Sequence, residues 1–495
     1  MAGIAATQDR LQSAFVVLLI GLLSLAVGAA ISLNAQVGFL LAVVVIGLIV
    51  FLLAPPAIFV LSALIAAIAF RGLVTLHVLP SVATFVDIPL VWGALIGALI
   101  KTTDRPQIAR KQLWWIGLLS LSMLVSWAFH QAEVIRPVLY LLLLGEPFAV
   151  VAALTLAPPS LKLRRVLWLT AVSLVLVQVP FALVQIMFLG LGDHIQGTLY
   201  GAGAGAHTIS AVITIGGIWW VVSGPGKLAT RVMLTLPLFV IPLLADAKQV
   251  ILTLPAMLIG GSLRRHPALT VFSGVLLVGA VVGLLRYAPA GDVAVNFLEQ
   301  ARAGKSGKAA AAEVVWDKVT ADPVSFAFGR GPAQTVSRAA FMTTDRLLAS
   351  DSPLRVFGLE PAEIATQADA YATSKTGYLK ATSFNSGISS ALGVLGDLGF
   401  VGLTVYLGLI VAMIRRLRRK GTPAAMVAAG GWAMFAVLGL TFDWWEQPPF
   451  VVFLGVISGL ALLSHDVRPV PTEEEADRPQ PPSYRSERSP ASTAR

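Results

Sequence analysis

The sequence has no cysteine, and only 13% of its 495 residues are charged. Without cysteine, disulfide bonds, thiolate metal ligands and a cysteine nucleophile are excluded. A soluble domain has about a quarter charged residues, whereas 56% of this chain is hydrophobic. The scarcity of charge therefore predicts an integral membrane protein.

Patterns typical of metal and nucleotide sites are also missing. The six histidines are scattered, without HxxxH or HExxH spacing, which disfavours a zinc site. No DD or DxD pair stands between the apolar segments, and the nearest approach to one is Asp443 with Glu446. The stretch GTLYGAGAGAHTIS at 197–210 lacks GxGxxG spacing and follows no predicted strand, which disfavours a nucleotide loop. We expect no metal and no cofactor.

Apolar runs of roughly 15 to 24 residues fill most of the chain, which suits helices that cross a bilayer. They predict an all-α membrane protein with about 12 to 14 transmembrane helices. The predicted helices cover residues 13–33, 37–53, 56–76, 86–100, 113–129, 137–156, 166–189, 206–222, 232–245, 249–262, 267–285, 391–414, 424–441 and 449–463.

Two of these segments need interpretation. Residues 13–33 are too long an apolar run for a signal peptide and lack a cleavage site, so we interpret them as a retained helix. The short segments 232–245 and 249–262 favour a re-entering hairpin over one long tilted helix. Such a hairpin places Asp246 and Lys248 at its outer turn.

The cations are concentrated in alternate loops, most densely at Arg415, Arg416, Arg418, Arg419 and Lys420. The positive-inside rule then predicts cytoplasmic N- and C-termini and an extracytoplasmic long loop in a multi-pass membrane protein. The same loops account for the net charge of +10, so nucleic-acid binding is not expected.

The pattern divides the chain into four parts. Residues 1–285 form an N-terminal transmembrane bundle of about 11 helices, and residues 286–390 form an extracytoplasmic loop or cap. Residues 391–463 hold the last three helices, and the polar residues 464–495 a disordered cytoplasmic tail. Within the cap, helical patterns appear at 308–320, 337–349 and 361–374.

Ionisable residues near the outer membrane surface are the candidates for a site, because charge at membrane depth is costly and marks pathways or sites. Four of the candidates have an ordinary alternative: Lys248 as a turn charge that reaches the interface, His207 as a helix-start residue, Asp397 as a hydrogen-bonded carboxylate within the bundle, and Arg330 as a solvated turn residue. The candidates are Asp193, His194, His207, Asp246, Lys248, Arg286, Arg330, Asp397, Asp443 and Glu446.

Three local patterns, with the long loop before the last three helices, resemble the O-antigen ligase and O-antigen polymerase superfamily of bacterial glycan transferases. YGAGAGAHTI at 200–209 is similar to its glycine-rich turn before a helix, and LADAKQ at 244–249 to its Ser-Arg-Gly turn. FGRGP at 328–332 resembles its FGxG loop motif, and SFNSG at 383–387 with LGDLGFVG at 395–402 resembles its HN...ExGxxG segment. The family histidine is replaced by Phe384.

The resemblance implies a metal-independent glycosyltransferase of the cell envelope. Its donor would be a glycan on a polyprenyl pyrophosphate such as undecaprenyl pyrophosphate, and its acceptor a glycan or lipid-linked glycan. Lys248, Arg330 and Arg286 would then bind the pyrophosphate, and His207 or Asp397 would take the acceptor proton. Asp246 and Asn385 would support them.

Several questions stay open at the level of sequence. Polymerase and ligase differ only in the acceptor, which the sequence does not name. A transporter or flippase of lipid-linked saccharides, or a non-catalytic scaffold of a glycan-assembly complex, would also fit a polytopic bundle. The alternating glycines of 197–210 suit either close approach to an anion or a flexible turn that allows tight helix packing.

Overall fold

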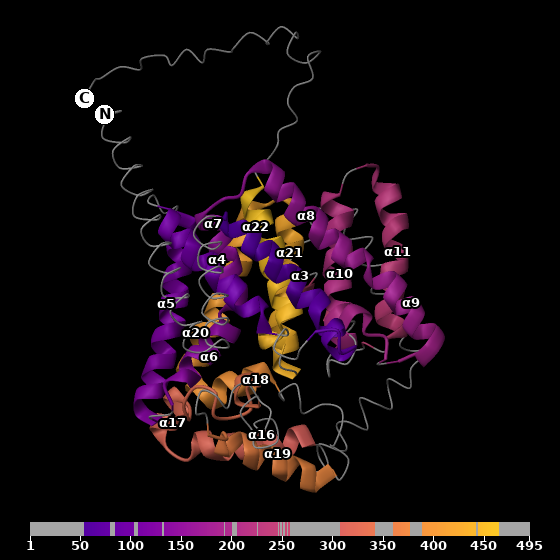
Figure 1. The fold of residues 1–495 in the computed structure, drawn as a ribbon. Coiled ribbons are helices and arrows are strands. Elements are labelled where there is room, and N and C mark those ends of the chain that lie inside the picture. The colour runs from indigo at the N-terminus through magenta and orange to yellow at the C-terminus, as the bar shows by residue number, and fades with distance from the viewer. Residues whose placement is uncertain are drawn as a thin grey trace, which may run out of the picture. The chain divides into compact units, whose positions relative to one another are not determined.

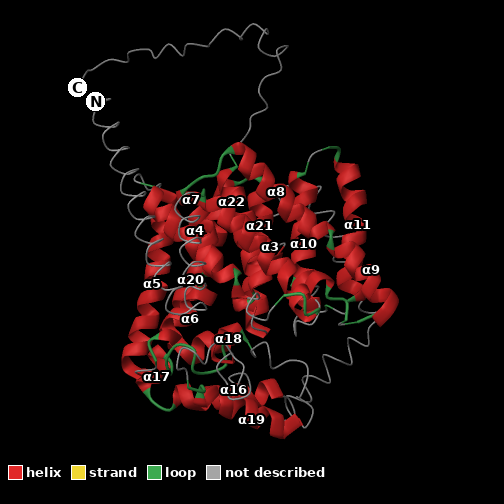
Figure 2. Ribbon diagram, viewed as in Figure 1, coloured by secondary structure: helices red, strands yellow, loops and turns green. Residues whose placement is uncertain are grey.

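The computed structural model describes residues 54–79, 85–102, 107–130, 133–192, 194–199, 205–224, 226–245, 247, 250, 253, 254, 256, 257, 307–341, 360–376, 389–441 and 444–464. Over these residues every regular element is a helix, as Figure 2 shows. The chain divides into two units, Met1–Leu463 and Ser464–Arg495.

The first helices of the described part are α3 to α11, drawn from indigo to magenta in Figure 1. Their bounds are α3 Pro56–Thr75, α4 Asp87–Lys101, α5 Gln107–His130, α6 Ile135–Leu144, α7 Glu146–Leu156, α8 Leu161–Leu176, α9 Gln178–Leu189, the 3-10 turn η2 Gly197–Leu199, α10 Gly205–Ser223 and α11 Leu228–Leu244.

The later elements include the helices of the long loop and the last three apolar helices. Their bounds are α16 Gly307–Thr320, α17 Pro323–Phe328, α18 Arg338–Phe341, α19 Glu363–Thr376, α20 Ser390–Lys420, α21 Pro423–Thr441, the 3-10 turn η6 Trp444–Glu446 and α22 Pro448–Leu463.

Six of the described helical stretches are long and apolar enough to cross a membrane, and a seventh arises if α6 and α7 form one bent span. This arrangement agrees with an all-α membrane protein. The predicted helices at 13–33, 37–53 and 267–285, and most of the one at 249–262, lie outside the described residues.

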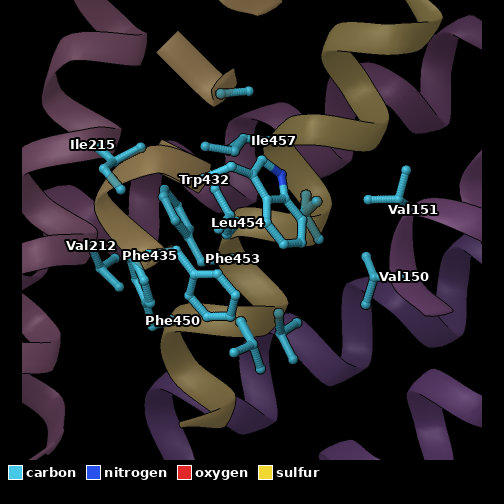
Figure 3. Close-up of a cluster of buried hydrophobic side chains, with 14 of the residues drawn as sticks. Val150, Val151, Val212, Ile215, Trp432, Phe435, Phe450, Phe453, Leu454 and Ile457 are labelled. Atoms are coloured by element: carbon cyan, nitrogen blue, oxygen red, sulfur yellow. The ribbon is translucent and has the colours of Figure 1, made fainter. Parts of the chain in front are cut away.

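Helix α22 is the centre of the bundle. Its residues from Pro448 to Leu462 are buried, and it packs against α7, α3, α21 and α10, as Figure 1 shows. Aromatic side chains fill the space around it: Trp432 stacks on Phe148 with ring centroids 5.0 Å apart and donates from Nε1 to Ser458 Oγ at 2.9 Å. Figure 3 shows Trp432 with Phe435, Phe450 and Phe453 in this core.

The outer faces of the bundle are apolar as well. Met187 and Phe188 on α9 are 78% and 79% exposed, and Trp114 on α5 is 72% exposed. Large apolar side chains in such positions are what a helix presents to lipid.

Two predicted helices are wrong in detail. Residues 137–156 were predicted as one helix, but α6 and α7 meet at Gly145 with a bend of 66°. Pro147 lacks an N–H and its ring would collide with the carbonyl of Leu143, so the helix cannot continue unbroken. Gly145 also lets the Trp92 ring approach, since an added Cβ would lie 2.9 Å from it.

The second correction concerns the helix predicted at 391–414. Helix α20 extends to Lys420 and is kinked at Gly399, which has a φ of 68°. Ser389 begins the helix by accepting a hydrogen bond from the Leu392 amide. Gly421, at a φ of 75°, ends it.

The long loop contributes helices on the side of α20 where that helix begins. Helices α16 and α19 fall where 308–320 and 361–374 predicted them, and α18 covers the described start of 337–349. Helix α17 was not predicted; it begins at the cap Asp322, followed by Pro323 in the first turn. Helices α16 and α17 both pack against α20.

Candidate functional site

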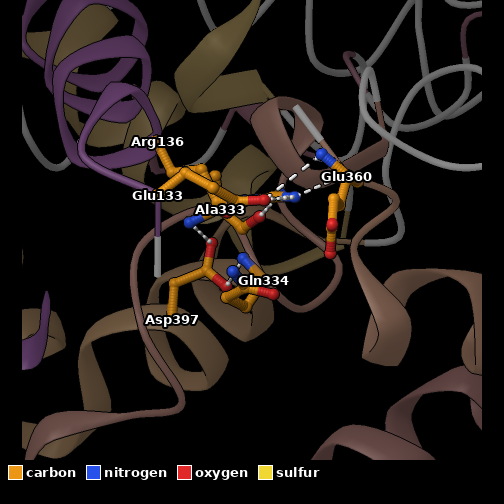
Figure 4. A network of polar contacts seen from close by, with 6 residues as sticks. All are labelled: Glu133, Arg136, Ala333, Gln334, Glu360 and Asp397. Carbon is orange, nitrogen blue, oxygen red and sulfur yellow. Dashed lines mark hydrogen bonds and ion pairs between the residues drawn. The ribbon is translucent and has the colours of Figure 1, made fainter. Parts of the chain in front are cut away.

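The carboxylate of Asp397 joins α20 to the loop segment that precedes α18. Asp397 is fully buried, and its Oδ2 accepts from the Ala333 amide at 3.1 Å. Its Oδ1 accepts from the amides of Gln334 at 3.0 Å and Thr335 at 2.7 Å, and from the Thr335 hydroxyl at 2.7 Å. Figure 4 shows the carboxylate beside the amides of Ala333 and Gln334. Successive backbone N–H groups around an anion form a nest, and we call this contact the Asp397 clasp.

Two glycines bring the backbones together next to the clasp. Gly329 and Gly399 have φ values of 78° and 68°, which only glycine adopts readily. A Cβ added at Gly329 would collide with the backbone of Asp397, and one at Gly399 with the Ala327 carbonyl and the Gly329 amide. The Arg330 amide also donates to the Gly396 carbonyl at 2.7 Å. FGRGP and LGDLGFVG, two motifs of the resemblance, are therefore in direct contact.

Helix α5 supports the same junction. The Ser126 hydroxyl donates to the Asp397 carbonyl at 2.7 Å, and the ring of Phe328 stacks on Phe129 with centroids 5.2 Å apart. The end of α5, the start of α20 and the FGRGP loop thus form one packed unit.

The guanidinium of Arg330 serves the loop itself. Its Nε donates to the Lys318 carbonyl at 2.7 Å, and its Nη2 lies 3.4 Å from Asp322 Oδ2. Asp322 in turn accepts from the Ser325 amide and hydroxyl, and these hydrogen bonds lower the pKa of the Asp322 carboxyl. Arg330 therefore joins the end of α16 to the start of α17. Its predicted contact with a pyrophosphate stays a prediction.

A buried arginine on α6 anchors the loop segment of the clasp and one further loop segment. Arg136 is 1% exposed and pairs with Glu133. It donates from Nη1 to the Ala333 carbonyl at 2.9 Å and from Nη2 to the Glu360 carbonyl, as Figure 4 shows. Burial opposes ionisation of Glu133, but the hydrogen bonds and charge of Arg136 outweigh burial and hold the pKa of Glu133 below its usual value.

Arg338, on α18, joins the long loop to the turn before α22. Its Nη1 donates to the Glu446 carbonyl at 2.8 Å and to Gln447 Oε1 at 2.9 Å. The buried Glu446 carboxylate accepts from the Ala339 amide at 3.1 Å. Glu446 was one of the sequence candidates, and the structure gives it a place in this junction.

A pair of carboxyl groups lies within the bundle at the starts of two helices. Asp87 begins α4 and Glu146 begins α7, each 1% exposed, and their side chains are within hydrogen-bond distance of each other. Oδ2 of Asp87 and Oε1 of Glu146 have no N–H or O–H partner in the described part of the chain. Ionised carboxylates in contact repel each other, and buried ionisable groups at membrane depth by default mark a site.

The positive charges of Arg71 and Arg338 act on both carboxyl groups of this pair. Arg71, Asp87, Glu146 and Arg338 were all missed as site residues at the level of sequence. The available signal was the presence of ionisable residues inside or beside apolar runs, which by default marks a site.

His207 lies at the start of α10 and is half-buried. The turn before it is fixed by two glutamines of α9. Gln185 accepts from the amides of Gln196 and Gly197, both at 2.8 Å, and donates to the Gly197 carbonyl at 2.9 Å. Gln178 accepts from the Thr198 amide at 2.8 Å. The start of the 197–210 stretch is thus held in a defined turn, while residues 200–204 are outside the described residues.

Of the predicted site residues, the structure brings the loop of Arg330 next to Asp397, since the Arg330 amide donates to the carbonyl of Gly396. Lys248, Arg286, Asp246 and Asn385 lie outside the described residues, as do Phe384 and Asp443. No known protein-family model matches the chain, and no curated protein sequence matches it significantly.

Proposed function

We propose that the protein is a membrane glycosyltransferase that transfers a glycan from a polyprenyl-pyrophosphate carrier to a sugar hydroxyl of an acceptor, by polymerisation or ligation, at the outer face of the bacterial cytoplasmic membrane. The observation that supports this most is the contact between FGRGP and LGDLGFVG through Gly329 and Gly399. The two motifs are more than 60 residues apart in the sequence, yet they are in contact. Together they join the long loop to the start of α20.

The reaction breaks the bond between the sugar and the phosphate, so negative charge develops on the departing pyrophosphate. Fixed cations at that position lower the barrier more than they stabilise the bound substrate. We propose Lys248 and Arg286 for direct contact with the pyrophosphate. Arg330 is proposed for the same contact, and its guanidinium also keeps the loop in place through the Lys318 carbonyl and Asp322.

The acceptor hydroxyl must lose its proton to a base within hydrogen-bond reach. Both oxygens of Asp397 are occupied by hydrogen bonds within the clasp, so we propose that Asp397 positions the loop and that His207 takes the proton. Asp246 and Asn385 are proposed as supporting residues.

One observation favours a second candidate, a transporter or flippase of lipid-linked saccharides. Helices α6 and α7 form a broken span bent by 66°, and the buried Glu146 at the break lies beside the buried Asp87. Broken helices and buried ionisable pairs are found at the binding sites and proton relays of transporters.

Reconstituted full-length protein distinguishes the two functions. Proteoliposomes with a fluorescent polyprenyl-pyrophosphate-linked oligosaccharide and an acceptor glycan would, for a transferase, release polyprenyl pyrophosphate and give a larger glycan. Lys248→Gln should reduce transfer by at least about 100-fold, the effect of losing one charge-stabilising group, while Lys227→Gln, a change at an exposed loop cation, should leave it unchanged.

A transporter would move the labelled lipid between leaflets without cleaving it, and Asp87→Asn with Glu146→Gln would abolish that movement. Movement with no released pyrophosphate would overturn the transferase proposal. Full transfer by Lys248→Gln would overturn the assigned role of Lys248.

A further inference from the structure

A basic cavity lies between α5 and α20, away from the Asp397 clasp. It has a volume of about 380 Å³ and is lined by four cations, Lys111, Arg415, Arg416 and Arg419. No carboxylate is among the described residues that line it. We call it the basic pocket.

Two buried donors in the basic pocket lack acceptors. Gln112 is 5% exposed and its Oε1 accepts from the Thr155 hydroxyl at 3.1 Å. Its Nε2, and Nη2 of Arg416, are buried without a hydrogen-bond partner in the described part of the chain. A buried donor without an acceptor is costly, and native structures rarely leave one. Both side chains line the basic pocket, so the two donors favour a ligand that supplies oxygen atoms and negative charge.

The basic pocket lies at the opposite end of α20 from the clasp. Arg416 lies 17 residues after the kink at Gly399, which corresponds to about 25 Å of helix, close to the thickness of a bilayer core of about 30 Å. Helix α5 runs alongside in the opposite direction, since Ser126 contacts Asp397 while Trp115 packs near Gly408. The pocket therefore lies at the depth where lipid headgroups meet the hydrocarbon.

The rest of the pocket wall is apolar. Trp115, Phe148, Leu409 and Met413 form it, and the neighbouring faces of the two helices expose apolar side chains, Trp114 at 72% and Val411 at 41%. A free phosphate ion gains nothing from such a wall, whereas a lipid places its glycerol and acyl groups against it. Basic pockets between transmembrane helices at this depth suit anionic headgroups.

We propose that the basic pocket binds the phosphate of an anionic phospholipid, with Gln112 Nε2 and Arg416 Nη2 donating to the phosphate oxygens. The surrounding cations add charge attraction, and the lipid's apolar part lies against Trp115 and Met413. This site is independent of the proposed glycan transfer.

The test is thermal unfolding of the purified, delipidated full-length protein in detergent. Phosphatidylglycerol added to the micelles should raise the unfolding midpoint by about 3 °C or more, because a ligand that binds only the folded state stabilises it. Phosphatidylcholine and inorganic phosphate at the same concentration should not. Equal shifts with inorganic phosphate would overturn the lipid assignment.

Variants test the two donors. Gln112→Leu and Arg416→Gln should each lose at least half of the shift caused by phosphatidylglycerol. Arg418→Gln, an exposed change on the same helix outside the pocket, is the matched control and should keep the whole shift. Full shifts in both donor variants would overturn the proposal.

The buried variants could disturb folding, so the exposed pair Lys111→Gln with Arg419→Gln provides a second measurement. This double variant should also lose at least half of the shift, since it removes two of the four pocket cations. Native mass spectrometry should show one retained phosphatidylglycerol on the wild type and none on the double variant. Equal retention by both would contradict the proposal.

Discussion

The backbones of Gly329 and Gly399 lie in direct contact. A side chain at either position would collide with the backbone of the facing segment. Each glycine has a positive φ, so the contact depends on conformational freedom as well as on space. The loop and the start of α20 are thereby fixed to each other at the place where two predicted motifs meet.

Gly399→Ala is expected to lower the free energy of unfolding by about 2–4 kcal/mol, because a left-handed conformation and a backbone collision both oppose the new Cβ. The measurement is unfolding in detergent followed by intrinsic tryptophan fluorescence. Gly117→Ala is the matched control, since a Cβ on this helical glycine meets nothing within 4 Å. The control should be neutral or stabilising by up to about 1 kcal/mol. Equal effects at both positions would contradict the close backbone contact at Gly399.

Asp397→Asn is expected to lower the free energy of unfolding by about 2–4 kcal/mol. The amide nitrogen of asparagine cannot accept from the N–H groups that the carboxylate now binds. Thr335→Val removes only the hydroxyl donor and should cost about 1 kcal/mol.

The same Asp397 variant separates a positioning role from a chemical one. If Asp397 holds the loop, the residual activity of Asp397→Asn keeps the wild-type pH dependence. A variant of normal stability that loses activity and one limb of its pH profile would instead show that Asp397 is the base.

The pair of Glu133 with Arg136 gives a stability that depends on pH. The folded-state pKa of Glu133 is lowered from 4.5, so the contribution is fully present above the unfolded value and is lost as the pH falls through the lower folded value. The difference in unfolding free energy between wild type and Glu133→Gln should therefore shrink below about pH 5. It should stay under about 1 kcal/mol even at neutral pH, because Glu133 is partly exposed.

Thermal unfolding of the wild type and Glu133→Gln between pH 7 and the acid limit of solubility measures this difference. Glu363→Gln, which removes an exposed carboxylate from α19, controls for the change in net charge. A difference that grows on acidification would contradict the assigned sign.

Arg338→Met is expected to destabilise the protein by about 3 kcal/mol, because it leaves buried acceptors of Glu446 and Gln447 without their donor and removes a positive charge near Asp87 and Glu146. Arg165→Met, on an exposed face of α8, should change stability by less than about 0.5 kcal/mol. If both substitutions lower the free energy of unfolding by the same small amount, Arg338 does not stabilise the junction between α18 and the turn before α22.

The apolar helices could be predicted because a helix buried in lipid or in the core needs a long run of apolar residues, which is visible in the sequence. Helix α21 matches its predicted start and end within one residue, and α3 does so as well. The break at Gly145 was missed because hydropathy averages over the bend, although Pro147 carries the local signal for it.

The junction at Asp397 could be predicted only in part. The resemblance singled out FGRGP and LGDLGFVG as motifs of one family. No local pattern, however, tells which backbone amides a carboxylate will bind. Its partners lie 62 to 64 residues earlier in the chain, and only the fold brings them together. The Asp87–Glu146 pair was missed for the same reason, since each residue alone reads as an ordinary acid in the first turn of a helix.

The order of the chain around the clasp has a consequence for biogenesis. The amides of residues 333–335 are made before Asp397, so this loop segment leaves the ribosome before the carboxylate that will bind it exists. Until α20 has been synthesised and inserted, the segment has no anion to close around. The loop must therefore acquire its final contacts late, after the membrane machinery has handled the helix that completes it.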